Sequence, residues 1–470
     1  MELTAGKAQV TGTGQHEIAC VPVDPDRAQV YSEGWQSWSV TTALPARATP
    51  YVVTSRESLA IDCQYGLAAP DGVFQGSGLL AIDPGDGGPV EVFGTADPAR
   101  EVRIIQAFLR DRQLVVSADG PVIHTADSGA GGHTAEGGSG RLTGALCRWG
   151  EAFAARAGVA PGSLRQIPPV WCSWYQYYSA VTEDDIAGNL AAMDDLDVPV
   201  GIVQIDDGYE AGPGDWLVPS GRFRDLPGLV RRILDTGRRA GIWIAPMLVG
   251  RASRLYAEHP DWVVRSQETG EPVFAGNVVG QECTALDLTH PGAAEYLSHV
   301  LSTMRAWGID YFKIDFVYAG AYEGRRHEDV PGVTAYRAGL RVVRDAIGPE
   351  ALLLGCGAPI LPSVGLVDAM RVGSDIDARY APPDGNASMP SQRNATRNTI
   401  ARAWQHGRFW VNDPDSLMLR PGVERREEWA GTVERFGGLR SSGDGLAELD
   451  EWGLETTRRL LVPSPVEPLV

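Results

Sequence analysis

Acidic side chains in this chain occur beside cations and aromatic rings in five short segments. The two most compact are Lys313-Ile314-Asp315 and Arg371-Val372-Gly373-Ser374-Asp375, in which a cation precedes a carboxylate by two or four residues. A pair of carboxyl groups can cleave a glycosidic bond, one acting as nucleophile or base and the other as acid. A nearby cation helps to keep a carboxylate ionised. Asp315 and Asp375 are therefore candidate reacting groups of a site for sugar chemistry.

Lysine is rare in this chain, and one of its two lysines lies beside a candidate carboxylate. The 41 basic residues comprise 39 arginines and two lysines, Lys7 and Lys313. Lys313 lies inside the apolar run Tyr311–Phe316. A compact ammonium makes contacts that a planar guanidinium cannot make. Lys313 is accordingly a candidate for a specific role beside Asp315.

Three further segments add aromatic rings and carboxylates. They are Trp171-Cys172-Ser173-Trp174-Tyr175, Asp206-Asp207-Gly208-Tyr209 and Trp410-Val411-Asn412-Asp413-Pro414-Asp415. Aromatic faces stack on the apolar face of a pyranose, and carboxylates accept hydrogen bonds from vicinal hydroxyl groups. Each segment also has a structural interpretation, because an aspartate after a strand often caps a helix or, beside proline, makes a turn. The joint occurrence of all five favours a sugar site.

The five segments follow strand-like runs in the part of the chain that starts at Val170. Eight such runs occur: Val170–Trp174, Val200–Asp206, Gly241–Met247, Asp310–Asp315, Ala351–Cys356, Ala369–Asp375, Arg408–Asn412 and Gly438–Ser442. Helical patterns cover residues 183–195, 227–240, 292–307, 333–347, 391–405 and 424–436. This alternation predicts an α/β fold with a closed (β/α)8 TIM barrel, whose strand C-terminal ends line the active site. The alternative, an open doubly wound sheet, usually has a glycine-rich turn after an early strand, and no GxGxxG occurs there.

The first part of the chain has a different pattern. Residues 1 to about 125 contain short apolar runs broken by turn residues, such as 51–54, 78–82 and 102–105, which predicts an antiparallel β domain. Residues 128–140 are rich in glycine and predict a mobile loop. We expect an N-terminal β-sandwich domain over 1–142, a linker helix over 143–167, the barrel over 168–463 and a tail over 464–470.

Composition excludes several classes of function. A formal net charge of −19 argues against nucleic acid and anionic membranes as partners. The sequence has no run long enough for a membrane span and no signal-peptide pattern at its start, so we expect a cytoplasmic protein. The six cysteines are spread singly, and the eight histidines form no HxH pattern, so we expect free thiols and neither a metal nor an organic cofactor.

The segments carry a resemblance that covers residues 34–463. The chain resembles the α-galactosidases, or melibiases, of glycoside hydrolase family 36. The segments that carry the resemblance are Gly34-Trp35-Gln36-Ser37-Trp38, Trp171–Tyr175, Gln204–Tyr209 with Gly214-Asp215-Trp216-Leu217, His259-Pro260-Asp261-Trp262, Phe312–Phe316, Gly355-Cys356-Gly357-Ala358-Pro359, Met370–Asp375 and Asn412–Asp415. It implies a barrel preceded by a β-supersandwich domain.

The resemblance also implies a role for each matching residue. Asp315 corresponds to the nucleophile and Asp375 to the general acid/base of a retaining double displacement. The remaining matched residues would bind the sugar: Asp206 and Asp207 its 4- and 6-hydroxyl groups, Lys313 and Arg371 its ring hydroxyls, and Trp38, Trp174, Tyr175, Trp262 and Cys356 its faces and edges. The implied activity is hydrolysis of terminal α-linked galactose from small α-galactosides such as melibiose or raffinose.

The sequence departs from the family pattern in three places and leaves alternatives open. The region before Gly34 is short, the family's C-terminal β domain is absent, and Ser374 stands where the family often has proline. The open alternatives are another α-linked sugar such as N-acetylgalactosamine, galactosyl transfer, a nucleotide-sugar transferase with a metal-binding DxD at Asp375–Asp377 or Asp413–Asp415, and a sugar-binding protein without catalysis. A metal-dependent hydrolase is the least favoured. The sequence does not specify the oligomeric state.

Overall fold

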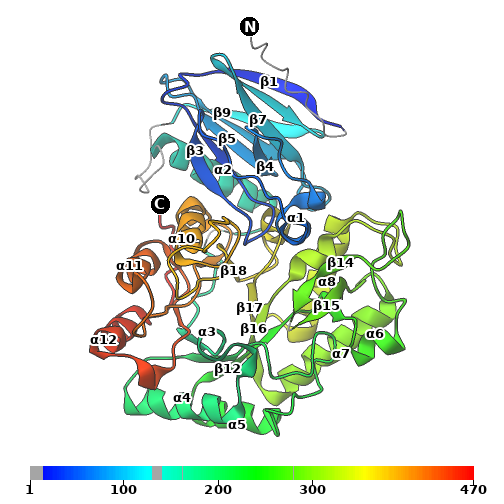
Figure 1. The fold of residues 1–470 in the computed structure, drawn as a ribbon, viewed down its shortest axis with the longest axis vertical. Helices are drawn as coiled ribbons and strands as arrows, with labels where there is room; N and C mark the ends of the chain where they lie inside the picture. The colour runs from blue at the N-terminus through cyan, green and yellow to red at the C-terminus, as the bar shows by residue number, and fades with distance from the viewer. Residues whose placement is uncertain (1–13, 130–139, 161, 279) are drawn as a thin grey trace.

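The chain folds into antiparallel sheets followed by a curled parallel sheet surrounded by helices (Figure 1). The computed structural model describes residues 14–129, 140–160, 162–278 and 280–470. The glycine-rich stretch expected to form a loop lies largely outside the described residues. None of the helices in these ranges has the length and apolar character that a membrane span requires.

The N-terminal part contains two antiparallel sheets that pack face to face around an apolar core. One sheet has the order β1 (His16–Pro22), β8 (Gln113–Ala118), β7 (Ile104–Arg110), β4 (Phe74–Ser77), and the other β3 (Thr42–Pro45), β2 (Gln29–Ser32), β5 (Leu79–Asp83), β6 (Val90–Thr95), β9 (Val122–Asp127). Alternate residues of both sheets, such as Leu80, Ile82, Phe93 and Val116, are fully buried between them. The antiparallel β prediction is confirmed.

One expected strand is absent from this region. Residues 51–54 form no strand, and the helix α1 (Arg56–Asp62) follows them, with the Ser55 hydroxyl capping its N-terminus by accepting from Ser58 N at 3.0 Å. The Tyr51 hydroxyl donates to Asn386 Oδ1 at 2.7 Å, so this segment contacts the second part of the chain instead of pairing within a sheet.

The second part is the eight-stranded parallel sheet, in which every expected run contains a strand. The order is β19 (Val411–Asp413), β18 (Ala369–Arg371), β17 (Leu352–Gly355), β16 (Ile309–Ile314), β12 (Arg239–Ile244), β11 (Ile202–Ile205), β10 (Val170–Cys172), β20 (Ser441–Ser442). The two ends of the sheet meet irregularly, because Leu439 N, just before β20, donates to Asn412 O of β19 at 2.8 Å. The sheet thus curls into the barrel that the alternation predicted.

Helices between the strands cover the outside of the barrel. They are α4 (Glu183–Asp195), α5 (Leu226–Asp235), α7 (Pro291–Trp307), α8 (Gly332–Ile347), α10 (Gln392–Ala401), α11 (Arg426–Phe436) and α12 (Glu451–Leu460), while α2 (Gly140–Arg156) links the two parts. The helix expected over 227–240 ends at Asp235, because Gly237 has a φ of +80° and β12 begins at Arg239. A small sheet of β13 (Leu248–Gly250), β15 (Gln281–Ala285) and β14 (Phe274–Val278) follows β12 and was not expected.

A fully buried ion pair joins the two parts of the chain. Arg402, just after α10, donates from Nε to Glu33 at 2.8 Å, and both side chains have no exposed surface. The Arg402 guanidinium also donates to the backbone oxygens of Gln36, Ser37 and Val372. One cation therefore fixes the segment after β2 against the strand end of β18.

Replacing Arg402 by methionine should destabilise the protein strongly. Arg402→Met leaves the Glu33 carboxylate buried without its cation, which typically costs about 3–5 kcal/mol. A lowered thermal unfolding temperature by calorimetry would show this. Arg459→Met, which removes the half-exposed pair with Glu434, is the matched control and should change stability by less than about 1 kcal/mol. Equal melting temperatures for the two variants would contradict the role assigned to Arg402.

Candidate active site

The C-terminal ends of the barrel strands open into a cavity of about 440 Å³. Its lining comprises Trp38, Glu57, Ser58, Ile61, Asp62, Trp174, Ser179, Asp206, Asp207, Trp243, Asn277, Val278, Lys313, Asp315, Phe316, Ser374, Asp375, Ser388, Met389 and Pro390. Seven of the eleven residues expected at the site are in this set. The structure thus brings the two candidate reacting carboxylates and the strand-end aspartate pair into one cavity.

Asp315 follows β16 and is held by three neighbours. Trp243 Nε1 donates to its Oδ2 at 3.0 Å, the backbone N of Phe316 donates to its Oδ1 at 2.8 Å, and Lys313 Nζ lies 4.0 Å from Oδ2. Burial raises the pKa of Asp315, whereas Lys313 and the two N–H donors act in the opposite direction. These contacts favour an ionised, oriented carboxylate whose next residue, Phe316, turns the chain away with a φ of +52°.

Lys313 contacts Asp206 more closely than Asp315. Lys313 Nζ lies 3.1 Å from Asp206 Oδ2, and the same oxygen accepts from Gln204 Nε2 at 2.5 Å. Burial, the largest single effect, lowers the pKa of Lys313, but its acidic neighbours, Asp206 first among them, together outweigh burial, so the pKa lies well above its ordinary value. Asp206 and Lys313 therefore form an ion pair inside the barrel, at a distance that suits a compact ammonium.

The neighbouring Asp207 has a different environment. Its side chain is buried, and its Oδ1 has no hydrogen-bond partner among the described residues. Burial, followed by the charge of Glu210, raises its pKa to about 9. Two adjacent aspartates thus have different surroundings, since Asp206 pairs with Lys313 and no ion pair joins Asp207 to a cation in the described part of the chain.

Arg371, the last residue of β18, binds three carboxylates on one side of the cavity. Its nitrogens lie 2.7 Å from Asp375 Oδ1, 3.2 Å from Asp413 Oδ2 and 2.8 Å from Asp415 Oδ1. Asp375 is the only one of the three that lines the cavity, and its side chain is about a third exposed (31%). Burial raises the pKa of Asp415 to about 7 although Arg371 lowers it. Arg371 therefore orients Asp375 from the side away from the cavity. Its positive charge also compensates the negative charge of two further buried acids, Asp413 and Asp415.

Four of the expected site residues do not line the cavity. The Tyr175 hydroxyl donates to Asp415, and Arg371 lies behind Asp375. Cys356 is fully buried, and burial and the charge of Asp315 hold its thiol pKa well above the usual range. Trp262 stacks on His259 with ring centroids 3.7 Å apart, so the structure does not bring Trp262 to the cavity.

Trp38 reaches the cavity from the N-terminal part of the chain. Ser37 N donates to Ala358 O at 3.0 Å and Ile360 N donates to Trp35 O at 3.1 Å, which docks this segment on the loop after β17. The Trp38 ring packs edge-on against Phe316 with centroids 5.2 Å apart. The residue that follows Asp315 thus contacts the N-terminal part directly.

Part of the cavity wall was not found from the sequence. Glu57, Ser58 and Asp62 come from α1, and Asn277 comes from β14 and donates to Glu57 Oε1 at 3.3 Å. Trp243 lies within the expected strand run Gly241–Met247, so its position was a usable signal, whereas nothing in the α1 residues points to the barrel.

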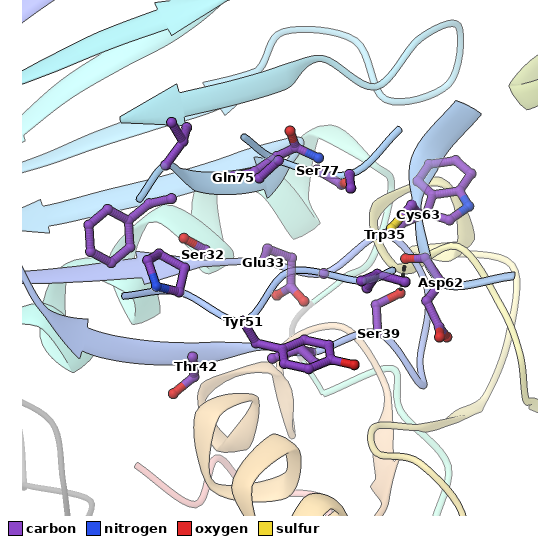
Figure 2. A pocket seen from close by; sticks show the side chains of 18 of the residues that line it. Ser32, Glu33, Trp35, Ser39, Thr42, Tyr51, Asp62, Cys63, Gln75 and Ser77 are labelled. Carbon is purple, nitrogen blue, oxygen red and sulfur yellow. Dashed lines mark hydrogen bonds between the residues drawn. The ribbon is translucent and has the colours of Figure 1, made fainter. Parts of the chain in front are cut away.

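Asp62 also borders a second, smaller cavity of about 100 Å³ in the N-terminal part (Figure 2). Figure 2 shows Asp62 beside Ser39, whose hydroxyl donates to the Asp62 backbone oxygen at 2.7 Å. Burial raises the pKa of Asp62 to about 7, and Gln36 Nε2 donates to its Oδ1 at 3.2 Å. Asp62 therefore lines both cavities.

A parallel barrel with carboxylates gathered at its strand ends is the architecture of a barrel glycosidase. Residues 164–343 match the Melibiase family model. An α-galactosidase from Thermus thermophilus solved in complex with stachyose is 28% identical, covers 95% of this chain and 94% of its own, and has a TM-score of 0.75. Over this region the chain is thus similar to the melibiases, and over most of its length its fold is similar to that of an α-galactosidase.

Two curated relatives match a shorter region. The bifunctional α-galactosidase/sucrose kinase AgaSK of Mediterraneibacter gnavus is 29% identical over 170 residues, which are 33% of this chain and 17% of that protein. The α-galactosidase AgaA of Geobacillus stearothermophilus is 25% identical over 171 residues, which are 34% of this chain and 22% of that protein. The chain spans about a fifth of the length of these curated relatives.

Replacing Arg371 by methionine should destabilise the protein more at pH 8 than at pH 5. Without the cation, the folded-state pKa of Asp415 rises further above the unfolded value, so stability is present at low pH and lost as pH rises through the raised value. Loss of one partner of a buried pair typically costs about 3–5 kcal/mol. Melting temperatures of variant and wild type from pH 5 to 8 measure the deficit, and a deficit independent of pH would contradict the electrostatic cause.

Proposed function

We propose that the protein is a retaining α-galactosidase that hydrolyses terminal α-linked galactose from small oligosaccharides such as melibiose or raffinose. The observation that carries this proposal is the presence of Asp315 and Asp375 in one cavity with Asp206 and Asp207. The kinship with α-galactosidases supports galactose as the sugar, since the related Thermus thermophilus structure contains stachyose.

The contacts of the two carboxylates assign them different roles in a double displacement. Asp315 accepts N–H donors on both oxygens and has Lys313 nearby, so it attacks the anomeric carbon as a carboxylate. Asp375 is the more exposed acid and is oriented by Arg371, so it protonates the leaving oxygen and later deprotonates the attacking water. In each of the two steps, the new bond to the anomeric carbon forms on the face opposite the bond that breaks. Two successive inversions give net retention of configuration.

The remaining lining residues position the galactosyl group. Lys313 and the strand-end pair, Asp206 and Asp207, offer one cation and several oxygens to sugar hydroxyl groups. Trp174 and Trp38 supply aromatic surface at the wall. Arg371, Tyr175 and Cys356 do not line the cavity, so their influence on the bound sugar is indirect and passes through the residues that lie between them and the cavity. We place the protein in the reducing cytoplasm, because all six of its cysteines are free.

Hydrolysis of 4-nitrophenyl α-galactoside in the presence of EDTA tests this function. We expect release of nitrophenol from the galactoside and much less from the α-glucoside and the N-acetyl-α-galactosaminide. NMR of the early product should show the α-anomer, since two inversions retain configuration. Turnover that requires a divalent cation would favour the transferase alternative, and galactose binding without turnover would favour a sugar-binding protein.

The two carboxylates should respond differently to the leaving group. Asp315→Ala should abolish turnover on every substrate, because the covalent intermediate cannot form. Asp375→Ala should slow melibiose hydrolysis by about 10²–10⁴-fold but retain more activity on the nitrophenyl galactoside, whose leaving group needs little protonation. Steady-state kinetics on both substrates measures the ratio. Equal losses on both substrates would contradict the acid role of Asp375, and circular dichroism checks that both variants fold.

A further inference from the structure

The short helix α1 presents one side to the catalytic cavity. It lies between the N-terminal sheets and the barrel (Figure 1). Four of its residues line the cavity and are called the α1 face below: Glu57, Ser58, Ile61 and Asp62. Their spacing of i, i+1, i+4 and i+5 places them on one side of a helix. Two carboxyl groups, one hydroxyl group and one apolar side chain thus border the cavity from outside the barrel.

The exposure of the α1 face decreases along the helix. Glu57 is exposed, Ser58 and Ile61 are half-buried, and Asp62 is buried. Glu57 also lines a surface cavity of about 610 Å³ that extends along the β14–β15 hairpin. The α1 face therefore leads from the interior of the catalytic cavity to its exposed rim.

Contacts at both ends hold α1 in this position. At the C-terminal end, the Ser39 hydroxyl donates to the Asp62 backbone oxygen at 2.7 Å. At the N-terminal end, Asn277 Nδ2 donates to Glu57 Oε1 at 3.3 Å. A surface that selects a ligand needs support of this kind, because its groups must stay in place when the ligand binds.

The loop that follows β18 brings α1 close to the acid. Under the proposed function the leaving group lies beside Asp375, which protonates the oxygen of the bond that breaks. Ser388–Pro390 line the cavity next to this acid, since the following Ser391 N donates to the Asp375 backbone oxygen at 3.0 Å. The Tyr51 hydroxyl, just before α1, donates to Asn386 Oδ1 of the same loop at 2.7 Å. The acid, the loop and α1 therefore border one part of the cavity.

The barrel supplies the groups proposed to hold the galactosyl residue. They are Asp206, Asp207, Lys313 and Asp315, at the ends of β11 and β16. The cavity of about 440 Å³ lies within the range of sites that enclose drug-sized ligands, about 300–1,000 Å³, so it can hold more than one sugar ring. The α1 face contributes none of the galactosyl-binding groups and is available for a second ring.

The chemistry of the α1 face suits an uncharged ring that carries hydroxyl groups. Glu57 accepts from the amide of Asn277, and Asp62 Oδ1 accepts from the amide of Gln36 at 3.2 Å, so the donors to both acids are neutral. Carboxyl oxygens accept hydrogen bonds from sugar hydroxyl groups, whereas an anionic leaving group would be repelled. Ile61 adds apolar surface for the C–H groups of a ring.

We propose that the α1 face binds the leaving group of the substrate, as an uncharged sugar ring next to Asp375. The N-terminal part of the chain then determines which leaving groups the enzyme accepts, while the barrel determines which sugar is transferred. The inference rests on the proposed function, because the leaving group is defined by the bond that Asp315 and Asp375 break.

The experiment compares two substrates that differ only in the presence of this ring. Melibiose releases glucose and methyl α-galactoside releases methanol, and both leave as primary alcohols that need protonation by Asp375. The ratio of kcat/KM for melibiose to kcat/KM for methyl α-galactoside therefore cancels effects on the galactosyl group and on the acid. In wild type this ratio should be about tenfold or more, since a truncated substrate loses the binding energy of the missing ring.

Two variants change the α1 face in different ways. Glu57→Ala removes an acceptor, and Ser58→Phe fills the space of the ring with a larger side chain. In each variant the ratio should fall by about fivefold or more. Glu455→Ala, which removes an exposed acid on α12 outside the cavity lining, is the matched control and should keep the wild-type ratio.

Each outcome decides the inference. An unchanged ratio in either folded variant, or equal kcat/KM of wild type on the two substrates, would overturn it while leaving the α-galactosidase proposal intact. No wild-type turnover of either substrate or of 4-nitrophenyl α-galactoside would overturn both. Melting temperatures identify a variant that does not fold, and if Ser58→Phe unfolds, the exposed position of Glu57 lets Glu57→Ala decide alone.

Discussion

The site is built around an excess of buried negative charge. Two cations, Lys313 and Arg371, face six strand-end carboxylates in the described part of the chain: Asp206, Asp207, Asp315, Asp375, Asp413 and Asp415. An unpaired buried carboxylate costs several kcal/mol. Three features of the structure reduce this cost. Each cation pairs with more than one acid, and backbone and indole N–H groups donate to Asp315. Where no cation is near, as at Asp207, the pKa of the acid is raised, which favours its protonated form. The six acids therefore have different surroundings, according to which of these three features each one has.

The N-terminal part of the chain is a wall of the same site. Arg402 ties Glu33 and the backbone of Gln36 and Ser37 to the end of β18, and Trp38 then enters the cavity beside Phe316. Trp38 is therefore placed by contacts that belong to the barrel. Because α1 adds Glu57, Ser58 and Asp62 on the same side, residues outside the Melibiase match help to shape the entrance.

The barrel and its strand ends were predictable because both depend on local patterns. Alternating apolar runs and helical segments identified all eight strands, and the polar residues that follow them lie at one end of a parallel barrel by geometry. Long-range packing was not predictable. The Tyr51–Thr54 run has strand-like residues but contacts Asn386 instead, and the strand β14 reaches the cavity through Asn277 and Val278, which no sequence pattern singled out. The sequence also does not show whether a side chain at a strand end lines the cavity or lies behind the residues that line it. Tyr175 and Arg371 occupy expected strand ends, yet both lie behind the cavity surface.

Asp206 and Asp207 show how neighbouring identical residues acquire different chemistry. Asp206 lies within reach of Lys313 and is an acceptor already occupied on both oxygens, whereas the buried Oδ1 of Asp207 has no hydrogen-bond partner among the described residues. Under the proposed function, a sugar with adjacent hydroxyl groups would meet a lysine donor that is paired to one aspartate and an acceptor on the other. Since the orientation of a hydroxyl group differs between epimers, a fixed donor beside a fixed acceptor discriminates between them more sharply than two mobile carboxylates would. Specificity then resides in the environment of the aspartate pair as much as in the pair itself.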